Sequence, residues 1–319
     1  MALHGVHHVT AVTARASENL RFYRQVLGLR LVKRTVNQDD VSAYHLFYAD
    51  KLGTPGWDMT FFDWPDIGPN RRGTDSIANT LFRAPGRDAL EYWQARFEEH
   101  GVTYGSLVTF AGRAALPFED PEGQRLTLVD DGGAEFEGEP WDEAGIPEAA
   151  ALRGFYGLML SVPRREAVEP VLSQVLGWEE SGRYPHPGNP SETITVFAMG
   201  GGGPGKEVYV LEQPGQPPAR LGYGGVHHAA FRVEDGEEQR AWNERLTRMG
   251  LRTSNIIDRF YFQSLYFRIS NGILFELATD GPGFAADEPL EALGERLSLP
   301  PFLEPQREQI EAGPRPLGV

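Results

Sequence analysis

Histidine and carboxylate side chains are the residues of this sequence whose spacing could support chemistry. The string VHH occurs at residues 6–8 and again at 226–228, and the two strings hold four of the eight histidines. A carboxylate, Glu276, interrupts the apolar string ILFELA. A charge in such surroundings is costly unless it is paired or binds a cation. Because the chain has no cysteine, a metal site would have to use histidine and carboxylate ligands.

Strand alternation separates the two histidines of each string. Neighbouring side chains of a strand point to opposite faces. His227 shares a face with Phe231, which belongs under a helix, and this leaves His228 on the more polar face. The same alternation selects His8 in the first string. His8, His228 and Glu276 can then converge on one concave face, provided that the two VHH strands are adjacent.

Two neutral imidazoles and one carboxylate form a facial triad, which leaves positions open on an octahedral ion. Such a site suits Fe(II) with an organic chelate and dioxygen, although Mn(II) or another divalent ion fits the same ligands. A single strand histidine is more often a structural residue, and this alternative stays open here. The sequence assigns no role to His45 in AYHLFYAD.

A fourfold repeat supplies the elements that must position these residues. Strand-like strings place His8, Asn79, Gly157 and His228 at equivalent positions, with intervals of 71, 78 and 71 residues. Each is followed by an amphipathic helical stretch that ends at a glycine, a residue typical of helix caps. The glycines are Gly28, Gly101, Gly177 and Gly250. Further strand-like strings follow, so the sequence predicts an α+β protein of four βαβββ modules.

The modules predict two domains, at 1–135 and 151–281, followed by a Pro-rich C-terminal tail at 282–319. The segment between the domains is acidic and contains glycine and proline, as linkers do. A net charge of -15 argues against nucleic acid or an anionic membrane as a partner. With no signal peptide and no membrane-spanning apolar run, we expect a cytoplasmic protein, which could form a homo-oligomer.

The combined motifs resemble the vicinal oxygen chelate superfamily, which includes glyoxalases and extradiol dioxygenases. LHGVHHVTAVT, LGLRLVKRTVNQDD, YHLFYADKLGTPGWDMTFF, GVHHAAF and ILFELATDGPGF are similar to the hydroquinone-type ring-cleaving dioxygenases. The resemblance implies two glyoxalase/bleomycin-resistance-like domains and one Fe(II) held by His8, His228 and Glu276. It also implies a small dihydroxyaromatic substrate and dioxygen as co-substrate. The residues that would surround this centre are His7, Thr10, His227, Arg259 and Tyr266.

Two other function classes remain open on the same scaffold. A glyoxalase-like isomerase or thiol transferase would work with Ni(II), Zn(II) or Mn(II) and would need no oxygen. A non-catalytic protein that binds an aromatic ligand would gain stability from the ligand without forming a product. Metal analysis together with oxygen uptake would separate the three classes.

Overall fold

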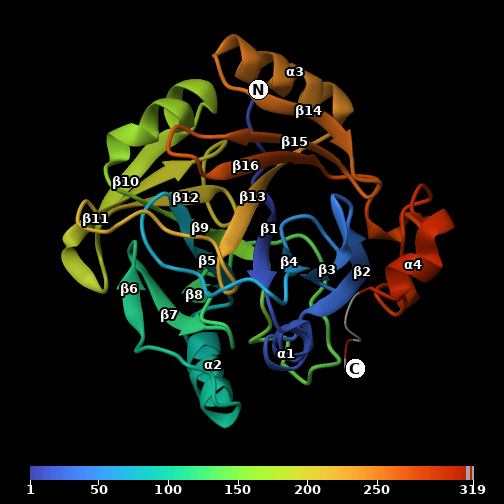
Figure 1. The fold of residues 1–319 in the computed structure, drawn as a ribbon. Coiled ribbons are helices and arrows are strands. Elements are labelled where there is room, and N and C mark those ends of the chain that lie inside the picture. Colours follow the sequence, from blue (N-terminus) through green and yellow to red (C-terminus); the bar gives the residue numbers. More distant parts are fainter. Residues whose placement is uncertain (314–316, 318–319) are drawn as a thin grey trace.

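Two curled sheets of eight strands each form the centre of the protein (Figure 1). The computed structural model describes residues 1–313 and 317. The first sheet has the order β14 (Thr253–Asp258), β15 (Gln263–Arg268), β16 (Leu274–Thr279), β13 (Val226–Val233), β1 (Val6–Thr13), β4 (Asp58–Asp63), β3 (Asp40–Ala49), β2 (Arg30–Asn37). The second has the order β10 (Glu179–His186), β11 (Asn189–Ala198), β12 (Glu207–Glu212), β9 (Phe155–Val162), β5 (Ser76–Ala84), β8 (Arg125–Asp130), β7 (Arg113–Glu119), β6 (Val108–Phe110).

Each sheet joins two modules that lie far apart in the sequence. The first and fourth modules meet where β1 pairs antiparallel with β13, and the second and third meet where β5 pairs antiparallel with β9. The predicted α+β class with paired βαβββ modules is therefore confirmed. Each sheet takes one module from residues 1–135 and one from residues 151–281, and those boundaries themselves stay a prediction.

The four module helices are of two kinds. The second and fourth modules carry regular helices, α2 (Arg87–Glu99) and α3 (Gly236–Arg248), which stand at the bottom and top of Figure 1. In the first module α1 (Ala16–Arg21) continues into a π-helix, η1 (Phe22–Val26), and in the third a 3-10 turn, η2 (Arg165–Ala167), precedes a π-helix, η3 (Val171–Val175). All four predicted terminal glycines have φ between 66° and 85°, the left-handed conformation that closes a helix.

The interiors of the two sheets differ. In the second sheet, large side chains such as Phe110, Tyr156 and Tyr209 fill the space between the strands. There Asn79, the counterpart of His8 in the repeat, donates a hydrogen bond from Nδ2 to Thr127 Oγ1 at 3.0 Å. The first sheet instead encloses a cavity, so a duplicated scaffold offers one hollow interior and one packed interior.

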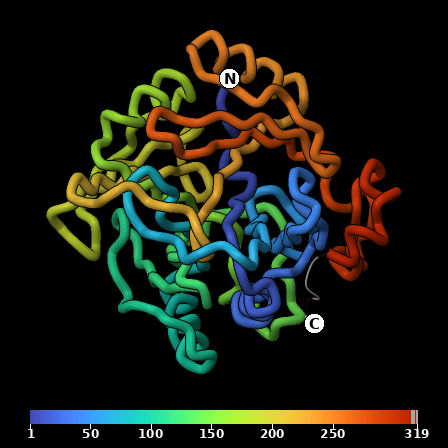
Figure 2. Tube along the Cα trace, in the orientation of Figure 1, coloured from blue at the N-terminus to red at the C-terminus, as the bar shows by residue number. Residues whose placement is uncertain are grey.

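The C-terminal tail packs against the edge of the first sheet, and Figure 2 shows it beside the blue N-terminal module. Its helical turns are η4 (Phe284–Ala286), η5 (Leu290–Ala292), η6 (Glu304–Gln306) and α4 (Arg307–Glu311). Leu303 joins Val36 of β2 in a small apolar cluster, whereas Phe302 is exposed. Residues 314–316 and 318–319 of the predicted tail lie outside the described residues. In the described part of the chain, no helix has the length and apolar character that a membrane crossing needs.

Candidate metal centre and aromatic cavity

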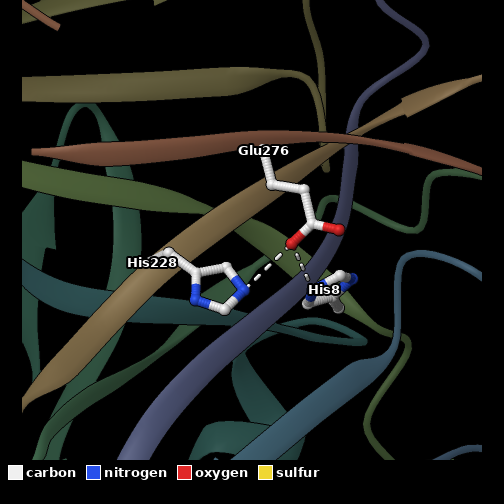
Figure 3. A group of neighbouring side chains, drawn as sticks. All are labelled: His8, His228 and Glu276. Atoms are coloured by element: carbon white, nitrogen blue, oxygen red, sulfur yellow. Dashed lines mark ion pairs between the residues drawn. The ribbon is translucent and has the colours of Figure 1, made fainter. Parts of the chain in front are cut away.

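The pairing of β1 with β13, and of β13 with β16, brings His8, His228 and Glu276 together inside the first sheet. His8 Nε2 lies 3.2 Å from Glu276 Oε2, and His228 Nε2 lies 3.0 Å from the same oxygen (Figure 3). All three side chains are buried, and their candidate ligand atoms lie within 4.8 Å of one another. Three strands that are far apart in the sequence thus direct two imidazoles and one carboxylate at a single point.

Two β-bulges place the remaining histidine of each VHH string beside its neighbour. Between Val6 and His8 the partner strand β13 advances by one residue only, so His7 is the extra residue of a bulge. The same irregularity on β13, between Val226 and His228, makes His227 an extra residue. A bulge interrupts the alternation of faces. The expected placement of His7 and His227 on the opposite face is therefore wrong: the Nδ1 atoms of each pair lie 3.0 and 2.8 Å apart.

The contacts of His7 determine which nitrogen of His8 carries the proton. His7 Nε2 lies 3.2 Å from the carbonyl oxygen of Thr279, which only accepts, so this nitrogen must donate. Burial, and to a smaller extent His8, lowers the pKa of His7 well below its usual value, so the ring is neutral and its Nδ1 accepts. His8 therefore donates from Nδ1 to His7, while its Nε2 faces Glu276.

Glu276 is held as a carboxylate with one oxygen directed at the two rings. Its Oε1 accepts a hydrogen bond from Ser264 at 2.5 Å, while Oε2 faces Nε2 of both His228 and His8. Burial raises the pKa of Glu276, but His8 and His228 outweigh burial and hold the pKa well below its usual value. One carboxylate oxygen and two imidazole nitrogens that face one another form a donor set that fits a divalent cation.

Arg259 and Tyr266 stand together beside this centre. Tyr266 pairs across the strands with Glu276, and its ring lies 5.7 Å from that of His228. The guanidinium of Arg259 lies 5.6 Å from the centre of the Tyr266 ring and donates two hydrogen bonds to Asp39, at 3.2 and 2.8 Å. Burial, and then Glu276, raises the pKa of Tyr266, so its hydroxyl keeps its proton and can donate.

An aromatic cavity of about 320 Å³ opens beside the candidate ligands His8 and His228. Its apolar wall includes Phe47, Phe62, Trp64, Phe262 and Leu274. His8, His227, His228, Arg259 and Tyr266 also line it, whereas His7 and Thr10 do not. Burial, and then His228, lowers the pKa of His227 to about 3, so this ring is neutral as well.

Thr10 belongs to a chain of hydroxyl groups in the sheet. Its Oγ1 lies 2.8 Å from Thr60 Oγ1, which in turn lies 3.0 Å from His45 Nε2. His45 lines the cavity, and the sequence assigned it no role. Ser264 and Asp39 were also missed, although the alternation of QSLYFR places Ser264 on the face of Tyr266. The contact of Asp39 with Arg259 joins positions 220 residues apart and has no local signal in the sequence.

Comparison with known proteins identifies the scaffold. The family model "Glyoxalase/Bleomycin resistance protein/Dioxygenase superfamily" matches residues 5–128 and 158–280. The crystal structure of a Bacillus subtilis protein, provisionally described as a dioxygenase, superposes with a TM-score of 0.91. It is 34% identical and covers 100% of this chain and 98% of that chain. Glyoxalase I from Zea mays shares the fold at a TM-score of 0.62 and 12% identity, over 86% of this chain and 92% of that chain.

Two relatives have names that specify a reaction. MhqA of Bacillus subtilis, provisionally described as a ring-cleaving dioxygenase, is 47% identical over 317 residues, which is 99% of this chain and 100% of that protein. A chlorohydroquinone/hydroquinone 1,2-dioxygenase of Sphingobium indicum is 33% identical over 313 residues, which is 96% of this chain and 94% of that protein.

Proposed function

The chain belongs to the glyoxalase/bleomycin resistance protein/dioxygenase superfamily, and from this premise we propose that it is an Fe(II)-dependent ring-cleaving dioxygenase of a hydroquinone-type substrate. The observation that carries the proposal is the buried group of His8, His228 and Glu276, whose two histidines line an aromatic cavity. Full-length similarity to a chlorohydroquinone/hydroquinone 1,2-dioxygenase supports the substrate class. The reaction would consume one dioxygen per ring and leave both oxygen atoms in a product with one carboxyl and one carbonyl end.

The three ligands would hold a single divalent ion. Bound Fe(II) would supply a Lewis acid that favours the phenolate form of the substrate, and open positions for the hydroxyl oxygen and dioxygen. The apolar wall would bind the ring and exclude water from it. Phe62 and Trp64, whose rings are stacked 5.3 Å apart, form one part of that wall.

The residues around the centre have separable roles. Tyr266, as a protonated hydroxyl, and Arg259, as a cation, can stabilise negative charge that develops on oxygen. His7 uses both ring nitrogens within the protein, so we assign it to the positioning of His8. His227 lines the cavity, and its Nε2 has no hydrogen-bond partner among the described residues, so we assign the transfer of the substrate hydroxyl proton to His227.

The first prediction concerns metal and turnover together. Purified without oxygen, loaded with Fe(II) and mixed with hydroquinone, the protein should consume oxygen and form ring-opened product in equal amounts. Glu276→Gln and His228→Ala should lose both iron retention and turnover, because each removes one of three ligands. His4→Ala, at an exposed histidine, is the matched control and should keep both.

Two results would count against the proposal. Oxygen uptake by metal-free protein would exclude the assigned centre. Conversion of a thiol adduct without oxygen, supported by Ni(II) or Zn(II), would instead favour a glyoxalase-like isomerase. Mass spectrometry of the product distinguishes the two reactions, because only ring cleavage adds both atoms of dioxygen.

A further inference from the structure

His45 is a cavity histidine that the proposed chemistry does not use. It lies on β3, which is separated from β1 by β4 alone, and it lines the same cavity as His8 and His228. Neighbouring strands are about 4.8 Å apart, so β3 lies about 10 Å from the strand of His8 along the sheet. A single aromatic ring with an oxygen at each end fits a gap of that order.

The ring of His45 is fixed in place by its neighbours. Its centre lies 4.0 Å from that of Phe47 and 4.5 Å from that of Phe62, so the imidazole stands between two aromatic rings. Its Nε2 lies 3.0 Å from Thr60 Oγ1. Its Nδ1 has no hydrogen-bond partner among the described residues. The side chain of His45 lines the cavity.

Several other polar side chains on this part of the wall already form hydrogen bonds within the protein. Both terminal nitrogens of Arg259 donate hydrogen bonds to Asp39, and Gln38 donates from Nε2 to the carbonyl oxygen of Arg259. Asn37 accepts from the backbone of Asp39. Among the described residues, His45 Nδ1 is thus a cavity-wall nitrogen that no protein group engages, and it lies beside the rings of Phe47 and Phe62.

We propose that Nδ1 of His45 hydrogen-bonds the substrate hydroxyl that is remote from the metal, and thereby selects a para-dihydroxylated ring. The proposal rests on the proposed function, since it assumes that the other hydroxyl is placed at His8, His228 and Glu276. A phenolic hydroxyl both donates and accepts, so either neutral tautomer of His45 can bind it. The ring is neutral because burial, with smaller contributions from His8 and His228, lowers its pKa well below the usual value.

The test compares two ligands on the Fe(II)-loaded protein without oxygen, so that binding is measured and no turnover occurs. Hydroquinone carries the remote hydroxyl and phenol lacks it. By calorimetric titration the unchanged protein should bind hydroquinone about threefold to tenfold more tightly than phenol, the range of one hydrogen bond. His45→Phe keeps the aromatic packing but removes both nitrogens, and should bind the two ligands equally.

Two further variants separate recognition from folding. His45→Gln, which restores a donor and an acceptor, should recover part of the preference for hydroquinone. His100→Phe, at an exposed histidine that ends α2, should keep all of it. Thermal unfolding and iron content of each variant establish that the fold and the metal centre persist.

The outcomes also distinguish this inference from the function on which it rests. A preference for hydroquinone that survives in His45→Phe would overturn the role of His45 and leave the dioxygenase proposal intact. Equal binding of phenol and hydroquinone by the unchanged protein would do the same. If neither ligand binds the Fe(II)-loaded protein, the proposed function fails first, and the inference fails with it.

Discussion

At the scale of single residues, the two VHH strings are similar in geometry and different in use. Each bulge brings two Nδ1 atoms within hydrogen-bond distance. Only His7 then hydrogen-bonds a backbone carbonyl through its Nε2, whereas His227 lines the cavity. The repeat therefore places one histidine against a backbone carbonyl and the other on the cavity wall.

His7→Phe should weaken metal binding without unfolding the protein. The substitution removes the acceptor that keeps the His8 proton on Nδ1, and loss of such a partner typically lowers metal affinity about 10-fold to 100-fold. Competition with a chelator measures the affinity directly and needs no turnover. His4→Phe, three positions earlier on an exposed side chain, serves as the control. An unchanged affinity in His7→Phe would show that the tautomer of His8 is fixed by other means.

At the scale of elements, the turn between β7 and β8 is tied to the first module through Asp120. Its Oδ1 accepts from the backbone nitrogens of Glu122 and Gln124, both at 2.9 Å. Its Oδ2 accepts from the Tyr23 hydroxyl on η1 at 3.3 Å. Burial outweighs these bonds and raises the pKa of Asp120 to about 7.

Asp120→Asn should change how the free energy of unfolding depends on pH. The folded-state pKa of about 7 exceeds the ordinary 3.8. The stability that Asp120 contributes to the folded state is therefore fully present below about pH 4 and is lost as the pH rises to about 7. The Asp120→Asn variant has no carboxyl group to titrate at this position. Its free energy of unfolding relative to that of the unchanged protein should therefore rise by up to about 4 kcal/mol between about pH 4 and pH 7. Urea unfolding at a series of pH values measures the difference.

Asp88→Asn, at an exposed carboxylate in the first turn of α2, is the control and should follow the unchanged protein. A difference between Asp120→Asn and the unchanged protein that is constant from pH 4 to 8 would contradict the assigned role of burial.

At the scale of the whole molecule, the tail is fastened to the first sheet by a buried group of charges. Lys33 of β2 is fully buried and pairs with Asp287, at 2.7 Å, and with Glu288. Its ammonium lies 4.7 Å from the ring centre of Tyr261, whose hydroxyl donates to Asp287 at 2.9 Å. Tyr261 also lines the cavity, so the tail supports one of its walls.

Lys33→Met should release the tail and destabilise the protein by about 3 to 5 kcal/mol, because it removes the buried cation that pairs with Glu288 and Asp287. Chemical denaturation measures the loss, and limited proteolysis should show earlier cleavage after residue 281. Lys51→Met removes an exposed partner of Glu139 and should cost no more than about 1 kcal/mol. Equal stability of the two variants would mean that the tail is held by its apolar contacts instead.

Local patterns in the sequence were sufficient to predict the four modules, their terminal glycines and the candidate ligands His8, His228 and Glu276. These features depend on residue type and on short-range periodicity, which the linear sequence contains. The isolated Glu276 in an apolar strand was informative because an unpaired buried charge is costly.

Tertiary structure alone decided the features that depend on register and on distant pairing. The bulges at His7 and His227 arise where β1 pairs with β13, and alternation within one strand cannot reveal them. The proton position on His8 depends on the carbonyl of Thr279, and the orientation of Arg259 depends on Asp39, each more than 200 residues away. The linear sequence thus predicted the candidate ligands, and the pairing of the first and fourth modules determined which residues contact them.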